Sequence, residues 1–494
     1  MHFIIFNDSS LFRRRASGAY RIATLIRKKG YSVKVIDYLS NWTVSDLFSV
    51  LDNLVSDDTV AFGFSYTWMH SDSTGELIEK LKQRYPNKKY FAGGQKPFQK
   101  EIGFDIMVSG YAEYFVDQLI DYLIDNKLPS GVKIVPSLKG IHINANTDYP
   151  ATNIEDLTTE YLNDDFLESS EVLTVELSRG CRFKCKFCCY PFLGFKHSTF
   201  RNRDNLKQEF IYNYEKFGIT SYTIADDTVN DDDAKLEMLA SVVEELPFEI
   251  DFAAFVRIDL VATKPHQMEL LKRCRIWAHF YGIETFHPVA GKAIGKGMNS
   301  DRIKQTLLDI RQYFLNNLGL YRGSCGLIAG LPGEPVDSWH ETQAWMRENW
   351  ITEAWHWWPL DITDDEENHI IQSEIARNKE QYGYSKITSN SRIVEFLNVV
   401  KEKNYLTHHQ VDDKFFYWQN EHTDFFEAFE FVHGIGTSNQ RMQHVPNFFI
   451  LSYKHLVKNK QDLLTLPATF EAKFQYQKPM QKYKNKLINF YKSS

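Results

Sequence analysis

Apolar and polar positions follow two periods along the first 145 residues, one typical of strands and one typical of helices. Short apolar runs that predict strands lie at residues 2–6, 31–36, 59–66, 89–92 and 105–108. Between them, apolar residues recur every three or four positions, which predicts helices at 18–29, 44–55, 74–85 and 113–123. Thr43 precedes the second helix and is its expected N-cap. Because strands that alternate with helices form parallel sheets, residues 1–145 are predicted to be a Rossmann-like α/β domain.

A second alternating series begins near Glu171, after a polar stretch at 146–170 that is predicted to be a surface linker. Strands are expected at 172–177, 221–225, 249–256, 276–283, 321–329 and 353–360, with helices such as 234–245 and 301–314 between them. Six such units predict a partial (β/α)6 barrel over residues 171–360. The active site of a barrel of this kind lies on the loops that follow its strands.

The pattern changes at residue 361, and residues 361–494 are predicted to form a mostly helical C-terminal domain. The acidic run at 364–367 is interpreted as a solvated loop. Residues 473–494 contain six lysines, no acidic residue and several interleaved aromatics. Such a composition can bind nucleic acid, but an amphipathic surface helix is the favoured interpretation.

Composition narrows the possible classes of protein. The net charge of -7 argues against a protein that coats nucleic acid. The N-terminal apolar run, residues 3–6, is too short for a signal peptide, and no stretch of 18 uninterrupted apolar residues is present. We therefore expect a cytoplasmic protein without a membrane span. Four of the six cysteines lie within residues 181–189, which indicates a metal site and not a disulfide framework.

Three of these cysteines, Cys181, Cys185 and Cys188, have the spacing C-x3-C-x2-C, with Phe187 before the last. Three thiolates can hold one side of a [4Fe–4S] cluster, which normally has four cysteine ligands, and would leave one iron open. A structural zinc site is the alternative, with a fourth ligand from Cys189 or His197.

The motif resembles that of the radical S-adenosylmethionine (SAM) superfamily, C-x3-C-x-aromatic-C. The resemblance implies that Cys181, Cys185 and Cys188 hold the cluster and that Phe187 packs beside it. It also implies that the open iron binds the amino and carboxylate groups of SAM. An electron from the cluster would then cleave SAM to methionine and a 5′-deoxyadenosyl radical.

Acidic and basic residues follow the next barrel strands. In the family, a polar motif at the position of Asp226 and Asp227 receives the ammonium of SAM; alternatively, one of these aspartates caps the helix that begins near Asp232. Arg257 and Glu284 resemble the positions that the family directs at the ribose and carboxylate of SAM. Ordinary ion pairing at the barrel mouth is an equal alternative for both.

The fifth barrel strand runs into Gly-Leu-Pro-Gly-Glu at residues 330–334. Gly326, Ile328 and Gly330 are similar to the family's G-x-I-x-G segment, whose backbone packs along the adenine of SAM. The Gly-Leu-Pro-Gly-Glu form also occurs in radical SAM proteins that carry an N-terminal cobalamin-binding domain.

The N-terminal domain resembles that cobalamin-binding domain at Gly93, Gly94 and Gly110. Gly110 begins a Gly-Tyr-Ala-Glu turn, which departs from the usual Gly-Glu-Gly-Glu. No D-x-H-x-x-G motif follows the first strand, so no protein histidine is expected beneath the cobalt. The alternative is a domain that only supports the barrel.

The sequence therefore predicts a radical SAM enzyme with a [4Fe–4S] cluster, SAM and possible cobalamin. The favoured reaction is cobalamin-dependent methylation of an unactivated carbon in a small molecule or peptide, with electrons from a reductant such as flavodoxin or ferredoxin. The alternatives are a radical rearrangement or oxidation without methyl transfer, and a zinc- or cluster-stabilised binding module. Cys274 and Cys325 are expected to be buried core residues, and no catalytic residue is assigned.

Overall fold

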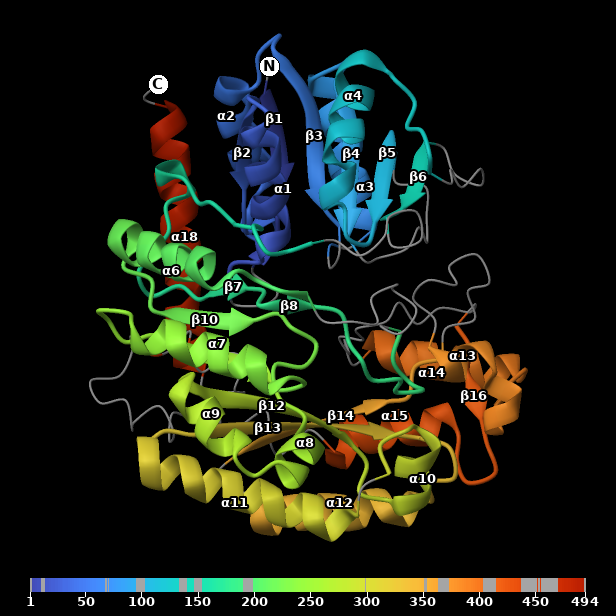
Figure 1. Ribbon diagram of the computed structural model, residues 1–494. Helices are drawn as coiled ribbons and strands as arrows, with labels where there is room; N and C mark the ends of the chain where they lie inside the picture. The colour runs from blue at the N-terminus through green and yellow to red at the C-terminus, as the bar shows by residue number, and fades with distance from the viewer. Residues whose placement is uncertain are drawn as a thin grey trace.

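The chain folds into two six-stranded parallel sheets with helices around them (Figure 1). The structure is a computed structural model that describes residues 2–9, 14–66, 69, 71–94, 103–132, 140–145, 153–189, 199–297, 299–350, 353–362, 373–402, 415–436, 451, 454 and 470–492. Within these residues, no helix is both long enough and apolar enough to cross a membrane.

The N-terminal sheet has the strand order β2-β1-β3-β4-β5-β6. Its strands are β1 (His2–Phe6), β2 (Ser32–Ile36), β3 (Thr59–Ser65), β4 (Lys89–Gly94), β5 (Ile106–Ser109) and β6 (Ile141–Asn144). Its helices are α1 (Ser17–Lys28), α2 (Val44–Leu54), α3 (Ser71–Arg84) and α4 (Val116–Asp125), the last preceded by the short η3 (Glu113–Phe115). The Rossmann-like prediction is confirmed. The order reverses between β1 and β3, and ligands of open parallel sheets bind at such a switch point.

The barrel sheet has the order β14-β13-β12-β11-β10-β7, and all of its pairs are parallel. All six strands are at the predicted places: β7 (Leu173–Val175), β10 (Ser221–Ile224), β11 (Asp251–Phe255), β12 (Ile276–Glu284), β13 (Arg322–Ala329) and β14 (Ala354–Pro359). The helices are α6 (Arg203–Phe217), α7 (Asp233–Glu244), α8 (Ile258–Thr263), α9 (Gln267–Arg273), α10 (Pro288–Ala293), α11 (Ser300–Leu318) and α12 (Val336–Asn349). The partial-barrel prediction is confirmed.

The open edge of the barrel at β7 is covered by the loop that follows β1. Arg15 forms an isolated parallel bridge with Leu173, and its backbone N–H donates to Val172 O at 2.8 Å. The Thr174 hydroxyl donates to the carbonyl of Arg15, also at 2.8 Å. An uncovered edge strand would present unpaired backbone groups, so this loop both protects β7 and joins the two domains.

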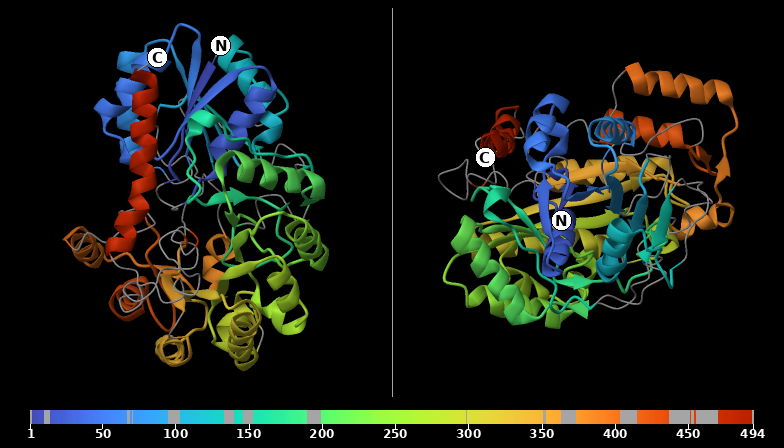
Figure 2. Two further views of the ribbon diagram at one scale, coloured as in Figure 1. Left: turned by 90° about the vertical axis from the view of Figure 1, so that its left-hand side faces the viewer. Right: turned by 90° about the horizontal axis from the view of Figure 1, so that it is seen from above.

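The described elements of the C-terminal region, residues 361–494, are mostly helical and lie in two places. Helices α13 (Glu374–Arg377), α14 (Asn390–Glu402) and α15 (Phe425–Phe431), with the strands β15 (Ser385–Lys386) and β16 (Trp418–Gln419), lie beside the barrel. Helix α18 (Phe470–Lys492) instead runs back along the N-terminal domain and packs on α2 (Figure 2). The acidic run at 364–367 lies outside the described residues.

Helix α18 is amphipathic, as the sequence predicts. Its buried residues Met480, Tyr483 and Leu487 recur every three or four positions and face the N-terminal domain. Part of the predicted linker, within residues 153–170, packs into the protein. Tyr161 and Asp165 are buried, and the Tyr161 ring lies 4.7 Å from the Tyr20 ring of α1.

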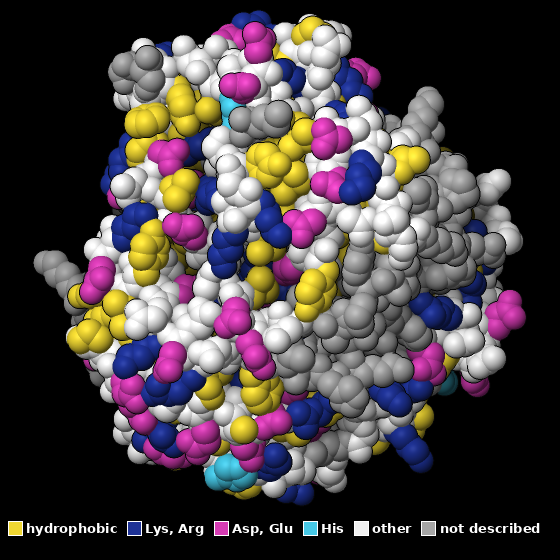
Figure 3. Space-filling view, turned by 45° about the horizontal axis from the view of Figure 1, so that its top comes forward, with side chains coloured by type: hydrophobic (Ala, Val, Ile, Leu, Met, Phe, Trp, Pro, Cys, Tyr) yellow, Lys and Arg dark blue, Asp and Glu magenta, His cyan; other side chains and the backbone are white. Residues whose placement is uncertain are grey.

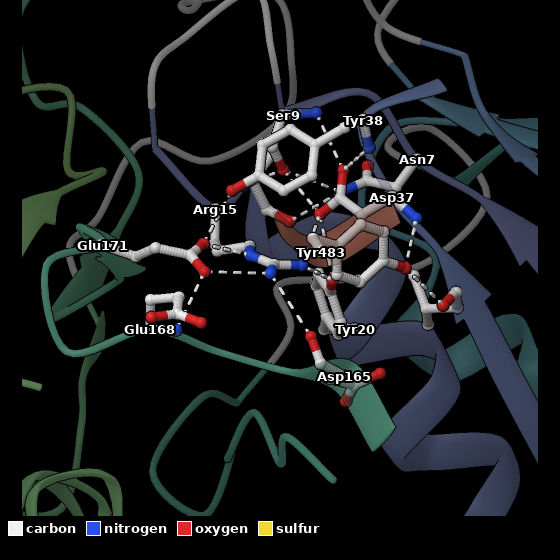
Figure 4. A network of polar contacts seen from close by, with 12 residues as sticks. Asn7, Ser9, Arg15, Tyr20, Asp37, Tyr38, Asp165, Glu168, Glu171 and Tyr483 are labelled. Carbon is white, nitrogen blue, oxygen red and sulfur yellow. Dashed lines mark hydrogen bonds and ion pairs between the residues drawn. The ribbon is translucent and has the colours of Figure 1, made fainter. Parts of the chain in front are cut away.

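Arg15 is the centre of a buried polar network that includes this linker (Figure 4). Its guanidinium donates to Glu171 at 3.1 Å and to the Tyr20 hydroxyl at 2.6 Å. It lies between the rings of Tyr38 and Tyr483, at 4.7 and 4.8 Å from their centroids. Arg15 also donates to the carbonyl of Asp165 in the linker at 3.3 Å. The network thus joins the first loop, the segment after β2, the linker and α18, which are far apart in sequence.

Candidate active site

Two adjoining cavities lie where the carboxyl ends of the two sheets face each other. In Figure 1 the strands of the N-terminal sheet point toward the barrel. The larger cavity, about 710 Å³, lies at the barrel mouth, and the smaller, about 310 Å³, lies at the N-terminal sheet. Both are lined by Ser17, Gly18, Ser65, Gly94, Gly110, Ala225 and Asp227. The two domains thus form one continuous site at the edges where parallel sheets bind ligands.

The cysteine loop forms one wall of the larger cavity. Cys181, Cys185 and Cys188 all line it and are half-buried. The Cys188 N–H donates to the Cys185 carbonyl at 3.1 Å, which makes a tight turn between these two cysteines. The loop therefore presents its three thiols to one space.

Two distant segments hold this loop in place. The Lys186 N–H donates to Ile294 O at 3.0 Å, just after α10, and Lys186 O accepts from the Ile375 N–H of α13 at 3.0 Å. The ammonium of Lys186 also pairs with Glu374 at 2.6 Å. These contacts could not be predicted from the sequence, because the partners lie more than a hundred residues away and belong to no motif.

Charged groups surround the thiols. Arg257 Nη1 lies 3.5 Å from Cys185 Sγ, and its guanidinium carbon lies 3.8 Å from the centroid of the Phe183 ring. Arg257 also donates to Asp259 at 3.0 Å. Burial raises the pKa of the Cys181 thiol, while Arg257 acts in the opposite direction. A fixed cation beside the loop stabilises thiolate ligands.

The donor set fits an iron–sulfur cluster better than a single ion. Among the described residues, no three His, Cys, Asp or Glu side chains converge as the ligands of one metal ion would. A tetrahedral zinc site requires such convergence, whereas the corner irons of a cluster need thiolates that are further apart. Cys189 does not line either cavity, and His197 lies outside the described residues. The three thiols on one wall leave the opposite side open to the cavity.

The structure separates the two adjacent aspartates. Asp226 is buried and accepts hydrogen bonds from the Leu177 N–H at 2.8 Å and from the Ser178 hydroxyl. It also pairs with buried Lys235 at 3.1 Å. Asp226 is thus held by buried groups of the protein and lines only the smaller cavity, whereas Asp227 lines both cavities. The alternative that either aspartate caps α7 is also wrong, because Asp232 accepts from the Ala234 N–H.

Glu284 lies at the barrel mouth with φ of 66°, and it lines the larger cavity together with Lys296. The ammonium of Lys296 donates to Glu284 at 3.0 Å and to the carbonyl of Gly282. It also lies 5.6 Å from the centroid of the Phe187 ring, beside the cysteine loop. Lys296 follows α10 in a segment without a motif, so sequence reasoning missed it. Arg257 and Glu284 are thus both ion-paired and both at the cavity.

The predicted role of the glycine segment of β13, which is to pack along the adenine of SAM, stays a prediction. Gly326, Ile328 and Gly330 do not appear among the described residues that line either cavity. A Cβ on Gly326 would meet the Phe280 ring at 3.0 Å, so this glycine lies behind a cavity wall. Gly330 has φ of 97°, and a Cβ there would lie 2.1 Å from Trp418. Gly330 therefore serves the packing of the C-terminal region on the barrel.

Backbone glycines form the sheet-side wall of the smaller cavity. Gly93, Gly94 and Gly110 line it, and φ values of 152° at Gly94 and 88° at Gly110 favour glycine. In the same cavity lining, Glu113 Oε2 and Arg179 Nη1 are buried without a hydrogen-bond partner among the described residues. Glycine backbone that a ligand can approach closely, and polar side-chain atoms without a hydrogen-bond partner, fit a large ligand that carries neutral hydrogen-bonding groups, as cobalamin does. Among the described residues that line the two cavities there is no histidine.

Two cysteines outside the cysteine loop, Cys274 and Cys325, and two tryptophans of β14, Trp355 and Trp357, are buried. Cys274 and Cys325 are fully buried, and burial raises the pKa of both thiols. Trp355 and Trp357 both donate to Gln343 Oε1 at 2.9 Å, inside the protein.

On the face shown in Figure 3, acidic and basic side chains are interspersed and no continuous basic patch is visible.

Comparison with known proteins agrees with this geometry. Residues 175–346 match the model of the radical SAM superfamily. Hopanoid C-2 methylase of Rhodopseudomonas palustris (strain TIE-1) is 28% identical over 131 residues, which cover 26% of this chain and 24% of that protein. The chain thus spans about a quarter of this curated relative.

Two solved structures share the fold. The radical S-adenosylmethionine methyltransferase TsrM of Kitasatospora setae, with cobalamin and a [4Fe–4S] cluster bound, matches with a TM-score of 0.61 and 13% identity, over 80% of this chain and 82% of that chain. The cobalamin-dependent S-adenosylmethionine radical enzyme OxsB, with aqua-cobalamin bound, matches with a TM-score of 0.58 and 14% identity, over 99% of this chain and 80% of that chain.

Proposed function

We propose that this chain, which belongs to the radical SAM superfamily, is a cobalamin-dependent methyltransferase that acts on an unactivated carbon of a small molecule or peptide. One observation carries the proposal: the cavity lined by the three cysteines adjoins the cavity at the carboxyl edge of the N-terminal sheet. A cluster with SAM and a corrinoid could therefore face each other across one continuous space. The methylase relative and the fold shared with TsrM and OxsB support the same reaction.

The residues at the barrel mouth have distinct roles in this proposal. Cys181, Cys185 and Cys188 hold the [4Fe–4S] cluster. Asp227 offers a carboxylate to the ammonium of SAM, by a charge-assisted hydrogen bond. Arg257 and Lys296 supply positive charge, and Glu284 supplies negative charge, around the carboxylate and ribose of SAM. When bound, the cluster supplies the electron, SAM the methyl group and the adenosyl radical, and cobalamin the relay for the methyl group.

The remaining cavity walls orient the ligands and exclude water. Gly93, Gly94 and Gly110 allow the backbone to approach the corrinoid closely. Phe255 and Phe280 form an apolar part of the barrel wall, with ring centroids 5.2 Å apart. Exclusion of water protects reactive species from side reactions.

We also propose the setting in which the enzyme works. A cluster with an open iron needs a reducing compartment and an electron donor, so we assign the chain to the cytoplasm with a reductant such as flavodoxin or ferredoxin. The net charge of -7, and the interspersed acidic and basic side chains on the face in Figure 3, argue against a nucleic-acid partner.

The experiment is anaerobic incubation of cluster-replete, cobalamin-loaded protein with SAM and a strong reductant. We expect both S-adenosylhomocysteine, from methyl donation, and 5′-deoxyadenosine, from radical cleavage. If 5′-deoxyadenosine alone forms, the chemistry is radical but without methyl transfer. If neither forms, the enzyme proposal fails.

Two variants control this experiment. Replacement of Cys181, Cys185 and Cys188 by Ala should remove the cluster's colour and both products. Cys189→Ala should keep the colour, because this half-buried thiol does not line the cavity. A triple variant that still binds about four irons would contradict the ligand assignment.

A further inference from the structure

Four buried charged residues connect the cysteine loop to the N-terminal domain. They are Arg21 of α1, Glu113 of η3, Glu176 just after β7, and Arg179 of β8 (Ser178–Arg179). Their side chains are 8%, 10%, 13% and 2% exposed, and all four line the smaller cavity. The barrel and the N-terminal domain each contribute two of them.

Arg179 contacts both carboxylates of this group. Its guanidinium makes a bidentate contact with Glu176, at 2.8 Å from Nε and 2.7 Å from Nη2. Nη2 also donates to Glu113 Oε1 at 2.8 Å. The guanidinium carbon lies 4.0 Å from the centroid of the Tyr111 ring, which covers its face. Arg21 pairs with Glu176 and lies 3.9 Å from Glu113.

The charges in this group balance, with two guanidinium groups and two carboxylates. Burial alone would raise the pKa of Glu176, but Arg21 and Arg179 outweigh burial and lower it to about 2. Loss of one member would leave a buried charge without compensation, which is costly. Planar bidentate contacts of this kind require arginine, because the lysine ammonium is a point charge without the fork.

The position of Arg179 links two functional segments. It directly precedes Gly180 and Cys181. Because Gly180 has φ of 101°, the chain turns sharply between Arg179 and Cys181. Tyr111 and Glu113 belong to the turn that begins at Gly110, which lines both cavities. The tyrosine and the glutamate of the Gly-Tyr-Ala-Glu sequence, Tyr111 and Glu113, thus both contact the guanidinium of Arg179.

We propose that Arg179 is a positioning residue that fixes the cysteine loop relative to the Gly110–Glu113 turn, and thereby sets the separation of cluster and corrinoid. The inference rests on the proposed function, since it presupposes a corrinoid at that turn. Methyl transfer between two bound cofactors depends on their distance, and a misplacement of about 1 Å can cost about 100-fold in rate.

The first test needs no corrinoid. Hydrogen exchange is measured in cluster-loaded wild type and in Arg179→Lys, over peptides that cover residues 110–116 and 178–189. We expect faster exchange in both peptides together. The matched control is Tyr38→Phe, which removes the 2.6 Å hydrogen bond to Glu171 in the separate Arg15 network and should leave both peptides unchanged. Unchanged exchange in Arg179→Lys would overturn the proposal.

The second test reads the placement of the cofactors. EPR of protein loaded with reduced cluster and cob(II)alamin should give one defined magnetic coupling in wild type, and a weaker or heterogeneous coupling in Arg179→Lys at equal iron and cobalt content. The rate of SAM-dependent methylation of the reduced corrinoid should fall about 10- to 100-fold. An Arg179→Lys spectrum identical to that of wild type would overturn the proposal.

A milder variant distinguishes a change in position from misfolding of Arg179→Lys. Glu113→Gln keeps the Glu176–Arg179 contact and weakens only the link across the domains, so it should shift both readouts in the same direction. If wild type retains no cobalamin, the proposed function fails, while the exchange experiment still decides whether Arg179 ties the two segments.

Discussion

At the scale of single residues, Asp226 and Asp227 show how neighbours in one motif can differ in role. The sequence places both at the end of a barrel strand and cannot separate them. In the structure, Asp226 is buried and paired with Lys235 beside the smaller cavity, while Asp227 also lines the larger cavity with the cysteines. Cysteine spacing, by contrast, was sufficient to bring three thiols to one cavity, because their ligand geometry is local.

Substitution of the two aspartates should separate stability from binding. Asp226→Asn leaves the buried ammonium of Lys235 with one carboxylate fewer, so we expect a loss on the order of 3 kcal/mol in unfolding free energy. Asp227→Asn should leave stability nearly unchanged and weaken SAM binding by about 10-fold, which corresponds to one charge-assisted hydrogen bond. Urea unfolding and equilibrium dialysis with SAM measure the two effects. Equal effects of both variants on SAM affinity would contradict the assignment.

The buried carboxylate of Glu176 should make stability depend on pH. Its pKa falls from 4.5 to about 2 on folding, so its contribution is fully present above pH 4.5 and is lost as pH falls toward 2. Relative to Glu176→Gln, wild type should gain on the order of 3 kcal/mol near pH 7, and the difference should shrink below pH 4.5. Urea midpoints at several pH values measure it. A difference that grows on acidification would refute the pairing.

At the scale of elements, the sequence located the barrel strands better than it located the partners of helices. All six barrel strands were found, because a buried parallel strand is a continuous apolar run. Strand β6 was missed, since Ile-His-Ile-Asn at residues 141–144 contains no continuous apolar run. The amphipathic pattern of α18 predicted a surface helix, but periodicity reveals only which face is buried and not which domain covers it.

The attachment of α18 to the N-terminal domain can be tested at Tyr483. Its hydroxyl accepts from the Asp37 N–H at 2.9 Å, so Tyr483→Phe leaves a buried donor unpaired. We expect a loss of about 1–2 kcal/mol in unfolding free energy. Lys482→Ala is the matched control on the same helix, because its side chain is 62% exposed and its ion pair with Glu168 is worth about 0–1 kcal/mol. Equal costs in urea unfolding would contradict the packing of α18.

At the scale of the whole molecule, function depends on two sheets that face each other. The sequence indicated each domain separately, from its own strands and glycine turns. It did not indicate the interface, because contacts such as Arg15 with Tyr483 or Arg179 with Glu113 join residues that no local pattern connects. The packing of Trp418 on Gly330 of β13 could not be predicted for the same reason, because Trp418 belongs to a distant part of the chain.

The most direct test of the account is the metal content of one chain. The protein is reconstituted anaerobically with iron, sulfide and hydroxocobalamin, passed through gel filtration, and analysed for iron, cobalt and zinc in the protein peak. The account predicts about four irons and one cobalt per chain, with no zinc, and a cobalt spectrum without a histidine ligand. Iron without retained cobalt would contradict methyl transfer through cobalamin, and zinc in place of iron would contradict the enzyme itself.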